Sequence, residues 1–125
     1  MPKTRVFVSY YFDSDKVLKD LIIGQAKLAD SPFEVIDHSL KEAAPEATWE
    51  AKALAAIGRA DTFIVMLGPN TRFAPGVLKE VAMANRLGKT RFQIIGYRDG
   101  SRKWAVPDAG VTYEWNWEML KRLLA

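Results

Sequence analysis

Short runs of β-branched and aromatic residues, separated by helix-length segments, constrain this chain more than any other feature. Such runs are typical of buried strands. Apolar residues in the segments between them recur at the spacing of a helix. The alternation predicts βαβ units and a parallel sheet. The expected strands are Arg5–Tyr10, Phe33–Asp37, Thr62–Leu67 and Arg91–Tyr97.

Thr62–Leu67 is the most continuously apolar run, so we expect it at the sheet centre with both faces covered. A short fifth strand is expected within Trp104–Val111. The predicted fold is a three-layer, doubly wound, flavodoxin-like α/β domain of four or five strands in the order 2-1-3-4-5. Ligands of such sheets bind outside the carboxyl ends of the strands.

Turn and cap signals delimit the expected helices. The first is capped by Asp13 or Ser14 and ends before Asp30. Its expected apolar face consists of Val17, Leu18, Leu21, Ile22 and Leu28. Later helices are expected from Pro45 to Gly58, from Pro75 to Leu87, and over Glu114–Leu124.

Composition narrows the class of protein. The 125 residues suit one domain spanning 1–125, and the absence of cysteine excludes disulfides and thiolate sites. A net charge of +3 does not argue for nucleic acid or a membrane surface as a partner. No apolar stretch is long enough to span a bilayer, so we expect a cytoplasmic protein. With His38 as the only histidine and no cage-like carboxylate spacing, we expect no metal site.

Three common occupants of this architecture lack their motifs. A dinucleotide-binding Rossmann domain needs glycines after the first strand, where this chain has Ser9-Tyr10-Tyr11-Phe12-Asp13. A phosphate-binding loop ending in Lys-Ser or Lys-Thr is absent from the sequence. A phospho-acceptor receiver domain requires an Asp at the end of the third strand, where this chain has Gly68-Pro69-Asn70.

Glu80 is the most informative single residue. Projected on a helix, it falls inside the edge of the apolar arc of the Pro75–Leu87 segment. One interpretation is a carboxylate that reaches water or pairs with Arg72 or Lys79. The other is a carboxylate held in a cleft at the carboxyl edge of the sheet, and geometry alone slightly favours the first.

Aromatic side chains at the same edge are a second signal. Tyr10, Tyr11 and Phe12 follow the first strand, and Trp49 lies on the second helix. Because side chains alternate along a strand, at least one of the three consecutive rings should be exposed or line a cleft. Rings beside a carboxylate suit a ligand with flat heterocycles and sugar hydroxyls, although core packing is the commoner role of any one ring.

Several ordered segments resemble the TIR-like domains of bacterial Thoeris-type anti-phage defence systems. They are RVFVSYYFDSD, VIDHS, ATWEAKALAAIGRADTFIVMLGPNT, GVLKEVAMANRLGK and the closing TYEWNWE, which together cover nearly the whole chain. The resemblance implies cleavage of the nicotinamide–ribose bond of NAD. The product would be a cyclic or conjugated ADP-ribose signal that activates a separate effector.

By motif position, Glu80 would be the catalytic carboxylate. It would stabilise the cationic charge that develops on the ribose. The resemblance places the substrate cleft at two loops, and the candidate substrate-binding residues are Ser9, Tyr10, Tyr11, Phe12, Asp37, Ser39 and Trp49. NAD would be the substrate, no prosthetic group is implied, and self-association could complete the site.

One departure keeps two alternatives open. The classical pattern has a Trp, and often a Cys, just before the helix glutamate, whereas this chain has Phe73-Ala74-Pro75-Gly76-Val77-Leu78-Lys79. A non-catalytic interaction or nucleotide-binding module is therefore one alternative. The other is a nucleoside-processing transferase of similar topology, with a carboxylate acting as nucleophile on a deoxyriboside.

Overall fold

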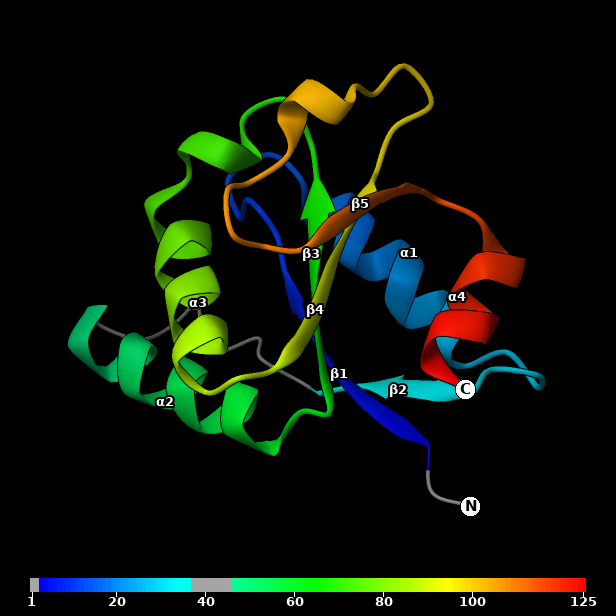
Figure 1. Ribbon diagram of the computed structural model, residues 1–125, viewed down its shortest axis with the longest axis horizontal. Coiled ribbons are helices and arrows are strands. Elements are labelled where there is room, and N and C mark those ends of the chain that lie inside the picture. The colour runs from blue at the N-terminus through cyan, green and yellow to red at the C-terminus, as the bar shows by residue number, and fades with distance from the viewer. Residues whose placement is uncertain (1–2, 37–45) are drawn as a thin grey trace.

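A five-stranded, all-parallel sheet forms the middle of the domain, in the order β2-β1-β3-β4-β5 (Figure 1). The computed structural model describes residues 3–36 and 46–125. The strands are β1 (Thr4–Ser9), β2 (Phe33–Val35), β3 (Thr62–Leu67), β4 (Thr90–Ile95) and β5 (Val111–Glu114). The expected doubly wound fold and strand order are confirmed.

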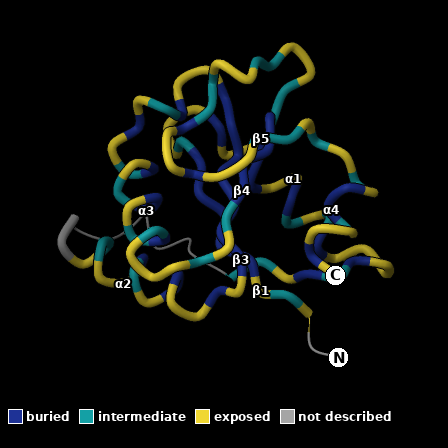
Figure 2. The backbone as a smooth tube through the Cα atoms, viewed as in Figure 1, coloured by how far each residue is buried: buried dark blue, intermediate teal, exposed yellow. Residues whose placement is uncertain are grey.

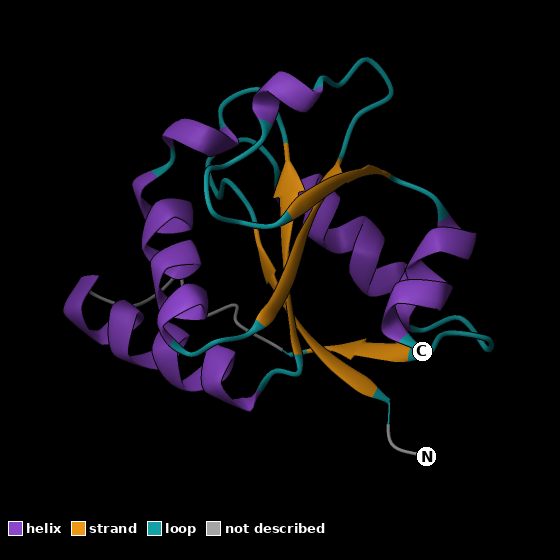
Figure 3. Cartoon of the chain, viewed as in Figure 1, coloured by secondary structure: helices purple, strands orange, loops and turns teal. Residues whose placement is uncertain are grey.

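Helices cover both faces of this sheet (Figures 1 and 3). They are α1 (Lys16–Ala26), α2 (Glu46–Arg59), α3 (Pro75–Arg86) and α4 (Trp117–Leu124), with 3-10 turns η2 (Thr71–Phe73) and η3 (Arg102–Trp104). One core cluster lies between the sheet and α1 and α4, and the other between the sheet and α2 and α3. In the described part of the chain, no helix has the length and apolar character needed to cross a membrane.

β3 is the centre of the molecule. Each of its residues is buried, and it is hydrogen-bonded to β1 on one side and β4 on the other. Figure 2 shows buried backbone concentrated in the strands and exposed backbone on the outer sides of the helices. The uninterrupted apolar sequence of Thr62–Leu67 is therefore explained by cover on both faces of the sheet.

The predicted apolar face of α1 is only partly right. Leu18, Ile22 and Ala26 are buried, whereas Val17, Leu21 and Leu28 are exposed. These three apolar residues are four apart and form one stripe of the helix, and Lys19 beside Leu18 is buried as well. Asp15, rather than Asp13 or Ser14, occupies the position before the helix.

The end of the chain also differs from the prediction. Trp104 lies in η3, the fifth strand comes later at Val111–Glu114, and the last helix begins only at Trp117. Pro107 and Gly110, the latter with φ of 90°, keep the preceding segment out of the sheet. The Asn116 side chain then caps α4 by accepting a hydrogen bond from the Met119 backbone N at 3.1 Å.

Candidate functional site

Glu80 lies at the centre of the buried face of α3. Its side chain is 0% exposed, as deeply buried as the core residues on the same helix. Val77, Val81 and Ala84 are its buried neighbours at helical spacing. The interpretation of Glu80 as a rim residue that reaches water is therefore wrong.

Ser9 holds this carboxylate. Its Oγ donates a hydrogen bond of 2.7 Å to Glu80 Oε1, across 71 residues of sequence. Ser9 is the last residue of β1 and is itself 0% exposed. The second carboxylate oxygen, Oε2, is buried as well. The fold thus brings two predicted site residues into contact at the carboxyl edge of the sheet.

The two cations proposed as surface partners of Glu80 lie in other contacts. Lys79 Nζ forms an ion pair with Glu50 at 2.6 Å, between α3 and α2. Arg72 Nη1 donates to the Lys103 carbonyl at 2.6 Å and its guanidinium lies over the Phe73 ring. Both groups contribute to the surface around α3.

The consecutive aromatic residues after β1 separate by face. Tyr10, at 1% exposure, packs in the cluster on the α1 and α4 side, opposite to Glu80. Tyr11 packs against the cluster on the α2 and α3 side, and Phe12 is exposed. The Asp13 carboxylate raises the pKa of Tyr11, followed by the loss of solvent around the phenol. Of the three rings, Tyr11 lies on the Glu80 side of the sheet, and the burial of Tyr10 does not favour contact with a substrate.

Trp49 approaches the same helix from α2. Its half-buried ring faces Gly76 in the first turn of α3, where an added Cβ would lie 3.6 Å from ring atoms Cζ2 and Cη2. Gly76 is about one helical turn from Glu80 along α3. Asp37 and Ser39, the two other predicted substrate-binding residues, lie outside the described residues.

A second buried carboxylate joins three loops at this edge, and the sequence did not predict it. Asp15 Oδ1 accepts a hydrogen bond from the Tyr97 hydroxyl at 2.8 Å, and Oδ2 accepts from Thr71 Oγ1 at 3.4 Å. Thr71 Oγ1 in turn accepts from the Gly68 backbone N at 2.7 Å. Burial, followed by the contact with Asp15, raises the pKa of Tyr97 to about 12. The loops after β1, β3 and β4 are fixed to one another by this network.

Among the side chains that the structure describes, in 3–36 and 48–125, no three His, Asp or Glu residues are grouped so that they could hold a metal ion. The chemistry available at the sheet edge is that of carboxylates, hydroxyls and aromatic rings.

Comparison with known proteins extends the fold assignment. No protein-family profile matches the chain, and no curated protein sequence does. Among 24 matching chains of known structure is a CMP N-glycosidase, BcmB, from Clostridium botulinum. The match has a TM-score of 0.59 at 19% identity and covers 96% of this chain and 97% of the other. At this identity the likeness shows a shared fold along nearly the whole of both chains.

Proposed function

We propose that this protein cleaves the N-glycosidic bond of a nucleotide, with Glu80 as the catalytic carboxylate. The observation that carries the proposal is a fully buried glutamate at the carboxyl edge of a doubly wound sheet, hydrogen-bonded to Ser9 at 2.7 Å. A glutamate is rarely fully buried, because removing its carboxyl group from water costs free energy. A chemical role explains why a charged group stands at a position suited to Val or Leu.

In the proposed reaction, the bond between C1′ of the ribose and the ring nitrogen of the base breaks. Its electron pair leaves with the base, and positive charge develops on the ribose. The Glu80 carboxylate stabilises that charge, and Ser9 keeps the carboxylate in one orientation. Water then forms the new bond at C1′ and loses a proton.

Because Glu80 is buried in the free chain, the side chains that cover it must move when substrate enters. Tyr11 packs on the same side of the sheet as Glu80, and Trp49 contacts the first turn of α3, so both rings are candidates for this movement. Movement of this kind is common where an enzyme excludes water from a charged transition state. The intrinsic fluorescence of Trp49 is the natural signal for it.

Two substrates fit the proposal. NAD is the first, because the sequence resembles Thoeris-type TIR-like domains, and its nicotinamide leaves as a neutral molecule without an added proton. When water forms the new bond at C1′, its proton is released to solvent. When a hydroxyl group takes the place of water, the product is a cyclic or conjugated ADP-ribose signal for a separate effector. CMP is the second, because the structural neighbour is a CMP N-glycosidase. Cytosine would leave with the proton that water loses, and ribose 5-phosphate would be the other product.

Two further parts of the proposal concern partners. No prosthetic group is needed, because the nucleotide itself carries the bond that breaks. Self-association could complete the substrate site, as expected from the resemblance to TIR-like domains. In that case turnover per molecule rises with protein concentration, and a rate strictly proportional to protein down to dilute monomer would contradict it.

Base release measured by chromatography tests the reaction. Purified protein is incubated at high concentration with NAD, CMP and the other nucleoside monophosphates, and nicotinamide or free base is quantified. We expect Glu80→Gln to lower turnover on the accepted substrate by about 10²-fold or more, by analogy with the loss of other preorganised electrostatic groups.

Glu118→Gln is the matched control. It makes the same chemical change at an exposed residue of α4 that pairs only at the surface with Lys121, and it should leave turnover unchanged. Full turnover by folded Glu80→Gln would exclude Glu80 as the catalytic group. No base release from any nucleotide by wild type would favour the non-catalytic interaction module.

A further inference from the structure

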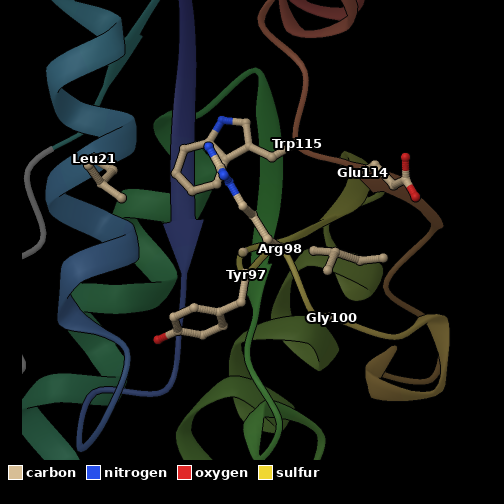
Figure 4. Close-up of a pocket in the computed structure, with 8 residues that line it drawn as sticks. Leu21, Tyr97, Arg98, Gly100, Glu114 and Trp115 are labelled. Carbon is tan, nitrogen blue, oxygen red and sulfur yellow. The ribbon is translucent and has the colours of Figure 1, made fainter.

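A cavity of about 450 Å³ opens at the carboxyl ends of β4 and β5, beside α1. α1 covers the face of the sheet opposite to the one on which Glu80 lies. Figure 4 shows Leu21 on one side of the cavity and Glu114 on the other, with the Trp115 ring and the Arg98 side chain overlapping between them in this view. Its volume is within the range of small-molecule sites, and its place at the carboxyl edge is where ligands of such sheets bind.

The aromatic walls of the cavity are held in position. Trp115 Nε1 donates a hydrogen bond to Gln25 Oε1 at 2.8 Å. The Tyr97 hydroxyl donates to Asp15, and the Tyr97 ring lies edge-on to Trp104 with centroids 6.2 Å apart. Trp115 also borders an adjoining hollow of about 310 Å³ with Trp117. A fixed ring with open space beside it can stack on a ligand without first losing its own conformational freedom.

The cavity also carries two opposite charges that do not neutralise each other. Arg98 and Glu114 are exposed, and within the described residues neither forms an ion pair. A guanidinium offers several donors in one plane and suits a phosphate or carboxylate. The Glu114 carboxylate can accept hydrogen bonds from amino or hydroxyl groups.

We propose that this cavity is a second nucleotide site, distinct from the carboxylate site at Glu80, and that it binds a nucleoside 5′-monophosphate. The phosphate lies on Arg98, the base stacks on Trp115, and Glu114 accepts from an amino group of the base or a ribose hydroxyl. A flat heteroaromatic ring joined to an anion is the chemistry that these side chains recognise together. The inference concerns binding and does not depend on the reaction proposed at Glu80.

Titration with AMP and CMP, followed by ¹H–¹⁵N NMR, tests the site. The reporters are the Trp115 indole N–H and the backbone amides of Gly96 and Gly100, which all lie at the cavity. We expect these signals to shift on addition of either nucleotide, in wild type and equally in Glu80→Gln, in which the proposed turnover would be strongly reduced. Ribose 5-phosphate and the free nucleoside, each lacking one recognised group, should bind at least about tenfold more weakly.

Two variants and one control locate the binding energy. Arg98→Ala and Trp115→Leu should each weaken binding by about tenfold or more. Arg59→Ala removes the same charge from an exposed residue at the end of α2, at the amino edge of the sheet, and should change nothing. Thermal melts of each variant show whether the fold is kept.

The outcomes separate this site from the proposed reaction. Shifts at Trp115 without base release would support the cavity and count against the reaction. Base release with shifts only in β1 and α3, and none at Trp115, Gly96 or Gly100, would overturn the cavity proposal. So would binding that survives both Arg98→Ala and Trp115→Leu in folded protein, or no binding at millimolar nucleotide.

Discussion

At the scale of single residues, the buried hydrogen bond between Ser9 and Glu80 affects both stability and the proposed function. Both side chains are fully buried, one at the end of β1 and one in the middle of α3. A hydrogen bond to a charged group stabilises a protein by about 1.5–3 kcal/mol, and desolvation of the carboxylate opposes it. The hydrogen bond from Ser9 therefore offsets part of the cost of burying Glu80.

A double-mutant cycle measures the coupling free energy between the Ser9 and Glu80 side chains. Ser9→Ala should destabilise the protein by about 1.5–3 kcal/mol, because the buried carboxylate loses a donor. In a Glu80→Gln background the same change should cost roughly 0.5–1.5 kcal/mol, since the acceptor is then neutral. Chemical denaturation of the four proteins gives the coupling energy.

Ser31→Ala is the matched control for this cycle. Ser31 is also buried, and its Oγ donates to the Phe33 carbonyl at 2.9 Å rather than to a carboxylate. Its replacement should cost the same in both backgrounds. Equal losses for Ser9→Ala in the two backgrounds would mean that the hydrogen bond does not stabilise the charge.

Tyr97 predicts a pH dependence of stability. Its pKa is 10.0 in an ordinary environment and about 12 in the folded protein. Between these values the unfolded chain has lost the Tyr97 proton while the folded chain keeps it. The stabilisation by Tyr97 is therefore complete below pH of about 10 and is lost as the pH rises through about 12.

Tyr97→Phe should be less stable than wild type at neutral pH, because Asp15 loses a donor at 2.8 Å. The difference between the two proteins should shrink as the pH approaches the folded pKa of Tyr97. Urea denaturation at a series of alkaline pH values measures it. Stability curves that stay parallel across that range would show that Tyr97 titrates normally.

At the scale of elements, Gly68 determines how β3 meets the loop that carries Asp15. A Cβ at Gly68 would overlap the Asp15 carboxylate, so a residue larger than glycine would displace the carboxylate from the end of the strand. Gly68→Ala should lower the free energy of unfolding by about 1–3 kcal/mol, as overpacking does elsewhere.

Gly58→Ala is its control. Gly58 lies inside α2, and nothing stands within 4 Å of an added Cβ. Alanine there should raise stability by about 0.5–1 kcal/mol, because it suits a helix better than glycine. If thermal melts showed both substitutions stabilising, the contact of Gly68 with Asp15 would not constrain the fold.

The elements that the sequence predicted well are those specified by local pattern. β3 has the expected bounds of Thr62–Leu67, and α3 begins at the expected Pro75. β5 was placed too early because it is an edge strand of four residues, two of them exposed, with little apolar pattern to mark it. On α1, the sequence predicted one broad apolar face, and contact with the sheet buries only Leu18 and Ile22 of it.

The candidate site likewise contains residues that a local sequence pattern marks and residues that only distant contacts reveal. Glu80 is visible in the sequence as a charge inside an apolar helical arc, although that pattern alone favoured the rim position that its full burial excludes. Asp15 is not visible in this way, because its partners Thr71 and Tyr97 lie 56 and 82 residues away. Nothing near Asp15 in the sequence distinguishes it from Asp13, and burial alone separates the two.

At the scale of the whole molecule, the sheet order sets the order in which backbone hydrogen bonds open. β3 has strands on both sides and helices on both faces, whereas β2 and β5 are edges. Amides that are buried in the centre of a domain exchange only through global unfolding, and those at edges exchange through local opening. We therefore expect the slowest exchange in Thr62–Leu67, slower than in β4, and the fastest strand exchange in β5, where Val111 is exposed.

Native-state hydrogen exchange in dilute denaturant tests this order and also calibrates the other predictions. The free energy of opening measured at the β3 amides should equal the free energy of unfolding measured by denaturation. In Ser9→Ala and in Gly68→Ala, both free energies should fall by the same amount. The free energy of local opening in β5 should be unchanged in these variants, because neither Ser9 nor Gly68 belongs to the paired strands β4 and β5. Faster exchange in β3 than in β4 would contradict the central position of β3 in the sheet. The burial of Glu80 on the side of α3 that faces β1 would then need another explanation.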